Sequence, residues 1–136
     1  MILFLDTSQK EKIIIAVYAR NVFKKRNLVK IKNHHSEELL KNIDAFLKIH
    51  SLKARSLSGI AVVSGPGGFS SLRIGITCAN TLAWALEIPV FGVAMAEFDS
   101  NEKEFRNFLF KKLKKARRGI FVVPLYGKEP NITFPH

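Results

Sequence analysis

The segment Ser64–Gly75, with the sequence SGPGGFSSLRIG, decides the fold of this 136-residue chain. A short apolar run at residues 59–64 leads into it, and a helix rich in small residues is predicted to follow at residues 70–86. Glycine permits positive φ and close backbone approach, while Pro66 holds its own φ at about −65°. The pattern therefore predicts a sharp corner between a strand and a helix.

Two common phosphate-binding patterns do not fit this corner. A Walker-type loop needs Lys followed by Ser or Thr after its glycines, and the segment has no such pair. The dinucleotide-binding pattern also fails, because Ser70 stands where, counted from Gly65, it needs a third glycine. A plain structural interpretation is a tight turn in which Ser70 or Ser71 caps a core helix.

The rest of the chain follows an order typical of α/β proteins. Strands are predicted at residues 1–5, 12–19, 28–32, 59–64, 90–93 and 120–123, helices at residues 36–49, 70–86 and 99–116, and an extended tail at residues 124–136. Asp99 and Glu102 have the spacing of a capping box for the last helix. The lysines of the third strand suit a sheet edge. Three leading strands followed by alternation predict a mixed sheet with helices packed on it.

Composition indicates a packed globular chain. Apolar residues make up 47% of the sequence and include 11 Phe. A single cysteine, Cys78, excludes an internal disulfide, and its place in an apolar helix predicts an inert buried thiol. Asp6 ends the first apolar run, no basic segment precedes it, and no run reaches the roughly twenty residues of a membrane span. We therefore expect a cytoplasmic protein without membrane contact.

The charge is strongly positive, with 22 Lys and Arg against 11 acids and a net charge of +11. Such an excess favours polyanions or acidic partners. Six cations gather near the end of the last predicted helix: Lys111, Lys112, Lys114, Lys115, Arg117 and Arg118. They predict either a solvated face or a contact with RNA.

Four motifs occur in one order: Asp6-Thr7-Ser8, His35-Ser36-Glu37, Gly65-Pro66-Gly67-Gly68-Phe69 with Leu72-Arg73-Ile74-Gly75, and Ile88-Pro89-Val90. Together, over roughly residues 1–97, they closely resemble the TsaB (YeaZ) family. The resemblance assigns the family motif to Asp6, Thr7, Ser36, Glu37, Gly65, Pro66, Gly67, Phe69 and Arg73. Gly68, Ser70 and Ser71 depart from the usual pattern, which reads Ser, Thr and Gly at these places.

The resemblance implies a single lobe of RNase H-like α/β fold, as in the actin/Hsp70-type ATPase superfamily. It implies a non-catalytic subunit that forms a heterodimer with the TsaD transferase, with TsaE joining the complex. This complex adds threonylcarbamoyl to adenosine in the anticodon loop of tRNAs reading ANN codons. We expect residues 1–97 to form the lobe, and residues 98–136 to form a basic helix and a tail in place of the family's second lobe. No activity alone, no cofactor and no metal are expected.

The partner surface is predicted on the two helices that flank the corner. Gly75, Ala79 and Ala83 recur every four residues and clear a stripe for close helix packing. The full predicted surface comprises Leu39, Ile43 and Phe46 on the first helix, and Leu72, Gly75, Ile76, Ala79 and Ala83 on the second. In the isolated chain a second copy is expected to cover it, giving a homodimer.

Two alternatives lack a TsaD partner. One is a basic RNA-binding module that uses the helix predicted at residues 99–116. That helix is also the expected contact if tRNA binds the family complex directly. The other is an RNase H-like nuclease, in which Asp6 with Glu37 or Glu38 could contribute to a two-metal site, although the strand ending at Ser64 offers no carboxylate. Hairpin-turn chemistry is the structural alternative for Asp6 and Thr7.

Overall fold

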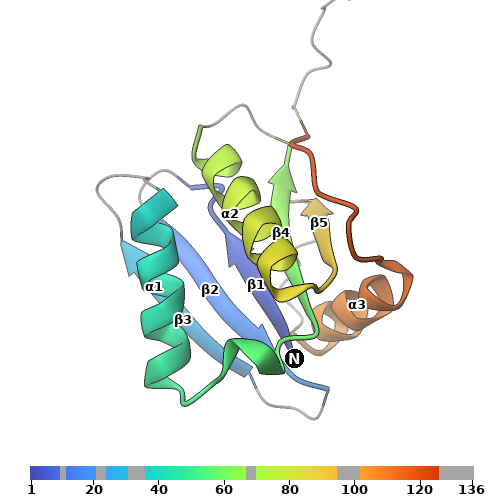
Figure 1. The fold of residues 1–136 in the computed structure, drawn as a ribbon, viewed down its shortest axis with the longest axis horizontal. Helices are drawn as coiled ribbons and strands as arrows, with labels where there is room; N and C mark the ends of the chain where they lie inside the picture. The colour runs from blue at the N-terminus through green and yellow to red at the C-terminus, as the bar shows by residue number, and fades with distance from the viewer. Residues whose placement is uncertain (10–11, 21–23, 31–35, 67–69, 95–101, 126–136) are drawn as a thin grey trace, which may run out of the picture.

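The computed structural model describes residues 1–9, 12–20, 24–30, 36–66, 70–94 and 102–125 (Figure 1). In chain order its elements are β1 (Ile2–Asp6), β2 (Lys12–Tyr18), β3 (Lys24–Lys30), α1 (Ser36–Ile49), the short 3-10 helix η1 (Ala54–Ser56), β4 (Gly59–Gly65), α2 (Ser70–Leu86), β5 (Val90–Ala94) and α3 (Glu102–Lys115). The proposed capping box at Asp99 and most of the predicted tail lie outside the described residues.

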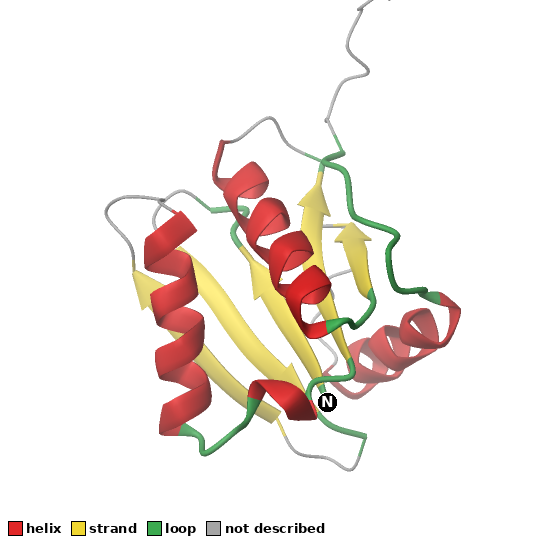
Figure 2. Cartoon of the chain, in the orientation of Figure 1, coloured by secondary structure: helices red, strands yellow, loops and turns green. Residues whose placement is uncertain are grey.

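The strands form one mixed sheet in the order β3-β2-β1-β4-β5 (Figure 2). β1, β2 and β3 pair antiparallel, whereas β1, β4 and β5 pair parallel. The short connection after β1 permits only an antiparallel return, and each parallel pair is joined through a helix. The mixed sheet with packed helices is therefore confirmed.

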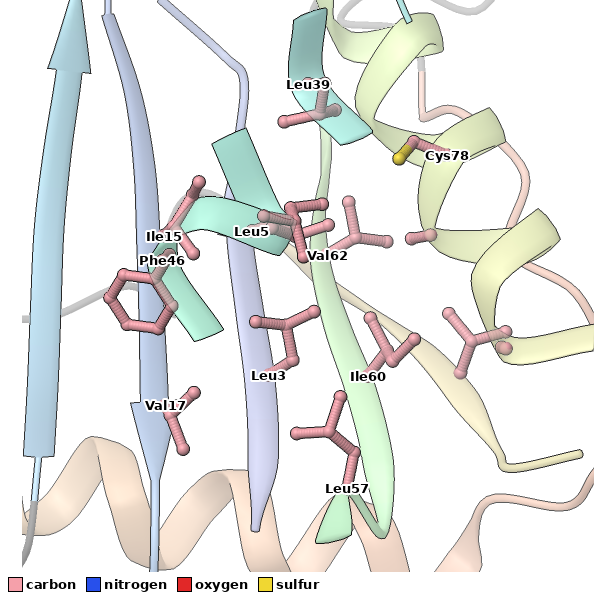
Figure 3. Close-up of a cluster of buried hydrophobic side chains, with 14 of the residues drawn as sticks. Leu3, Leu5, Ile15, Val17, Leu39, Phe46, Leu57, Ile60, Val62 and Cys78 are labelled. Atoms are coloured by element: carbon pink, nitrogen blue, oxygen red, sulfur yellow. The ribbon is translucent and has the colours of Figure 1, made fainter. Parts of the chain in front are cut away.

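Side-chain alternation divides the core into two layers, one on each face of the sheet. Leu3 and Leu5 of β1, with Ile60 and Val62 of β4, face α1 and α2 (Figure 3). The residues between them in sequence belong to the opposite layer, together with Phe105 and Leu109 of α3. The residues of β4 are all buried, as expected for a strand covered on both faces.

α3 is thus packed on the sheet, opposite α1 and α2 (Figure 1). Phe105 makes edge-to-face contacts with Phe4 and Tyr18, with ring centroids 5.3 and 5.8 Å apart. The sequence boundary at residue 97 falls in a segment outside the description. Its division of the chain stays a prediction, and the described part of residues 98–136 shares its core with the strands.

Two strand predictions need correction. The edge strand expected at residues 28–32 lies at Lys24–Lys30, and it does occupy the sheet edge. The strand expected at residues 120–123 is absent from this described segment, which is extended but irregular. Side-chain hydrogen bonds from Asn80 hold the backbone there instead of a neighbouring strand. No helix within the described parts of the chain has the length and apolar character to cross a membrane.

Candidate functional site

The corner predicted from sequence lies where β1 and β4 end and α2 begins. Thr7, directly after β1, is buried and its hydroxyl donates a hydrogen bond to the carbonyl oxygen of Ser71 at 2.7 Å. This bond joins residues 64 positions apart in sequence. It ties the first turn of α2 to the end of the central strand and so sets the position of the helix.

Gly75 makes this contact possible. A Cβ at this position would lie 2.1 Å from the Thr7 hydroxyl oxygen and 2.9 Å from its methyl carbon. Real Cβ atoms do not approach neighbours so closely, so only glycine lets α2 rest on Thr7. The motif residues Thr7 and Gly75 are therefore parts of one packing contact.

The Asp6 carboxylate is used within its own turn. Asp6 Oδ1 accepts hydrogen bonds from the Ser8 backbone N–H at 2.9 Å and from the Ser8 hydroxyl at 2.5 Å. All three residues from Asp6 to Ser8 are buried. This geometry is that of an Asx-type turn, which is the structural alternative raised for this motif. Within the described residues, no three His, Cys, Asp or Glu side chains converge as metal ligands would.

The other motif residues are only partly visible. Gly65 is buried at the end of β4 with a positive φ of 123°, and its peptide bond to the exposed Pro66 is cis. Arg73 is exposed on α2. Gly67 and Phe69 lie outside the described residues, as do the side chains of Ser36 and Glu37, although α1 begins at Ser36.

The surface expected for a partner is instead the core of the chain. Its eight residues are all buried: Leu39, Ile43, Phe46, Leu72, Gly75, Ile76, Ala79 and Ala83. Leu72 belongs to the layer beneath α3, and the others face the strands beneath α1 and α2 or rest on Thr7. The prediction that these side chains contact a partner is wrong, because within the chain they are already packed against the sheet or against Thr7.

Sequence reasoning missed the large apolar side chains that these two helices expose. Leu40 and Ile49 of α1 are 44% and 74% exposed, and Trp84 of α2 is 72% exposed. Leu40 directly follows the buried Leu39 and Trp84 directly follows the buried Ala83, so apolar character alone does not separate exposed from buried residues. A large apolar residue outside the stripe's helical spacing was the available signal.

The basic run does not act as one surface. Lys111, Lys114, Lys115, Arg117 and Arg118 are exposed, whereas Lys112 is half-buried. The Lys112 ammonium donates a hydrogen bond to the carbonyl oxygen of Gly92 in β5 at 2.8 Å. Five of the six cations therefore face solvent, in agreement with either interpretation of the run.

Cys78 is buried among the apolar residues beneath α2. Desolvation by burial raises the pKa of its thiol to about 11. The thiol therefore stays neutral near pH 7. An inert core cysteine, as predicted, fits this environment.

A 3-2-1-4-5 mixed sheet with helices on both faces and an aspartate ending its central strand defines an RNase H-like α/β lobe. The TsaB protein of tRNA threonylcarbamoyladenosine biosynthesis from Bacillus subtilis (strain 168) is 32% identical to the chain over 126 residues, covering 92% of the chain and 54% of that protein. The family model described as tRNA N6-adenosine threonylcarbamoyltransferase (TsaD) matches residues 29–99. The chain belongs to the TsaB (YeaZ) family, and its match to this model shows that it is also similar to TsaD.

Two further comparisons agree. The structure of YeaZ from Pseudomonas aeruginosa superposes with a TM-score of 0.61 at 30% identity, covering 68% of this chain and 44% of that chain. The tRNA N6-adenosine threonylcarbamoyltransferase of Limosilactobacillus fermentum is 38% identical over 60 residues, which are 44% of this chain and 17% of that protein. The chain spans about half the length of the TsaB relatives that it matches.

Proposed function

We propose that the chain is a non-catalytic subunit in tRNA threonylcarbamoylation that docks on a TsaD-type transferase. The match to a TsaB protein over 92% of the chain is the observation that carries this proposal. The finer points stay predictions: adenosine in the anticodon loop of tRNAs reading ANN codons, the participation of TsaE, and a cytoplasmic location.

The outer faces of α1 and α2 are the proposed docking surface. Leu40, Ile49 and Trp84 leave large apolar side chains in water on these two helices. Burial of apolar area stabilises a complex, and tryptophan is enriched among the residues that dominate binding energy. The buried stripe facing the sheet keeps the two helices in place, so the outer faces present a fixed surface.

A supporting role without chemistry agrees with the corner. The Asp6 carboxylate is engaged by Ser8, and Thr7 is engaged by α2. Both motif residues thus have a structural role within the lobe. We expect the isolated chain to show no ATPase, nuclease or transferase turnover; turnover that Asp6→Ala abolishes would contradict this and favour the nuclease alternative.

The docking proposal predicts that Trp84→Glu weakens binding to a TsaD-type transferase by roughly thirtyfold, the effect of losing one dominant interface side chain. Leu40→Glu should act in the same direction. Titration calorimetry of each variant with the transferase measures the effect, and circular dichroism checks the fold. Lys53→Glu, a change at the exposed residue before η1, is the control and should bind as the unchanged chain does.

Equal binding by Trp84→Glu, Leu40→Glu and the control would place the interface elsewhere. The mass of the chain in solution distinguishes the predicted homodimer from a monomer. If the unchanged chain dimerises, and Trp84→Glu separates the copies while leaving transferase binding intact, the exposed face serves self-association.

A further inference from the structure

A basic groove runs beside α3, on the face of the sheet opposite α1 and α2. It encloses about 670 Å³. Among the residues that the structure describes, its walls carry four cations, Arg20, Arg106, Lys111 and Lys114, against the one carboxylate of Glu104. The groove combines a strongly positive lining with an opening to solvent.

The cations come from two distant parts of the sequence. Arg20 lies just after β2, whereas Arg106, Lys111 and Lys114 lie on α3. Arg20, Lys111 and Lys114 are exposed and Arg106 is half-buried. A cluster of like charges held by folding, rather than by neighbouring sequence, creates a local potential that attracts polyanions.

The same groove contains aromatic surface. Phe108 and Phe110 line it and are half-buried. The Arg20 guanidinium carbon lies 5.4 Å from the centre of the Phe110 ring. Guanidinium groups and aromatic rings both stack on nucleic-acid bases, so we call Arg20 and Phe110 the platform of the groove.

We propose that this groove binds a single-stranded stretch of RNA. Phosphates contact Arg106, Lys111 and Lys114, and a base stacks on the platform of Arg20 and Phe110. Cations that follow a backbone beside aromatic side chains are the combination that single-stranded nucleic acids require, whereas an acidic protein segment needs only the cations. The identity of the strand as part of a tRNA rests on the proposed function; the groove and its chemistry do not.

This assignment divides the residues of the basic run among different places in the structure. Lys111 and Lys114 line the groove, while Lys112 is held by the Gly92 carbonyl. Lys115 and Arg117 line a different hollow beside β5. Arg20 and Arg106 join the site although neither belongs to the run.

Fluorescence anisotropy with a labelled oligouridylate of about ten nucleotides tests the groove directly on the isolated chain. In Lys111→Glu/Lys114→Glu two phosphate contacts are lost, so the slope of log K against log salt should become shallower by about 1.4 units, or about 0.7 for each contact. The matched η1 control is Lys53→Glu/Arg55→Glu, which changes net charge equally at two exposed residues, one just before η1 and one on it. It should keep most of the affinity and the original slope.

The stacking part has its own variant. Phe110→Leu keeps an apolar side chain but removes the ring, and should weaken oligouridylate binding roughly fivefold or more. Binding of polyglutamate, measured in parallel, should not change with this substitution. Circular dichroism confirms that each variant is folded.

Three results would overturn the proposal. The first is that the unchanged chain binds oligouridylate no better than the groove variant does. The second is that the η1 control loses as much affinity as the groove variant. The third is that Phe110→Leu leaves binding unchanged while polyglutamate competes fully. The last result would make the groove a site for an acidic protein. None of these measurements involves a transferase, so the docking proposal is tested independently by calorimetry with Trp84→Glu.

Discussion

At the scale of single residues, the contact between Gly75 and Thr7 connects the corner motif with the first strand. The sequence suggested that glycine at residue 75 clears space for another molecule. The space is filled within the chain, by a threonine whose hydroxyl also bonds to the carbonyl of Ser71. One missing side chain therefore determines how closely α2 approaches β1.

Gly75→Ala is predicted to destabilise the chain by roughly 1–3 kcal/mol, the usual cost of overpacking a fitted site. In an unobstructed helix interior the same change stabilises by about 1 kcal/mol, so the sign itself is informative. Urea unfolding followed by circular dichroism measures it. In a double-mutant cycle, Thr7→Ala should recover part of the loss because it removes the two nearest atoms. A stabilised Gly75→Ala would show that the close contact does not exist.

At the scale of elements, the segment 116–125 passes along the β5 side of the sheet from the end of α3 to the end of β4 (Figure 1). The Asn80 side chain both donates to the Val122 carbonyl at 3.0 Å and accepts from the Val122 N–H at 2.9 Å. The Leu125 N–H donates to the Ser64 carbonyl at 2.7 Å. An apolar run that favours a strand is thus held by the Asn80 amide and by one backbone hydrogen bond to the end of β4.

Asn80→Ala is predicted to release this segment, because it leaves two part-buried backbone groups of Val122 without partners, at a cost of about 1–3 kcal/mol. Trypsin should then cleave after Arg117 and Arg118 faster than in the unchanged chain. Amide hydrogen exchange at Val122 should rise as well. Thr81→Ala is the matched control, since that hydroxyl bonds only to the Thr77 carbonyl one turn earlier. Equal cleavage of both variants would contradict the role of Asn80.

At the scale of the whole molecule, the sheet has two apolar faces and needs helices on both. α1 and α2 cover one, and α3 covers the other with Phe105 and Leu109, which are 4% and 0% exposed. The basic helix is therefore also a structural element. Its buried stripe holds the sheet, and its outer residues form the proposed RNA groove.

Leu109→Ala is predicted to lower the global unfolding free energy by about 2–5 kcal/mol, as for other fully buried leucines. Leu39→Ala on the opposite face should have a comparable effect, and the two should unfold in single transitions. Thermal melts followed in the far ultraviolet test this, with the exposed Lys103→Ala as control. A Leu109→Ala variant that melts α3 alone, with the sheet unaffected, would support a separate unit after residue 97.

Local chemistry was sufficient to predict most of the fold. Alternating and helical spacing located three helices and four of the five strands and placed β3 a few residues late, and the glycines with Pro66 located the corner, because these signals depend on neighbouring residues alone. The same signals determined the mixed sheet and the family resemblance. They also erred at residues 120–123, which form no strand and of which Val122 is bonded to Asn80.

Tertiary structure alone decided which surfaces face outward. Helical spacing identifies an apolar stripe but not what covers it, so Leu39 and Ala79 could equally belong to an interface or to a core. The sheet covers them, which leaves Leu40, Ile49 and Trp84 as the large apolar side chains that α1 and α2 expose. Likewise no local pattern joins Arg20 to Phe110, because ninety positions separate them in sequence. They meet because α3 packs on the strands that lead to Arg20, a consequence of long-range burial rather than of local preference.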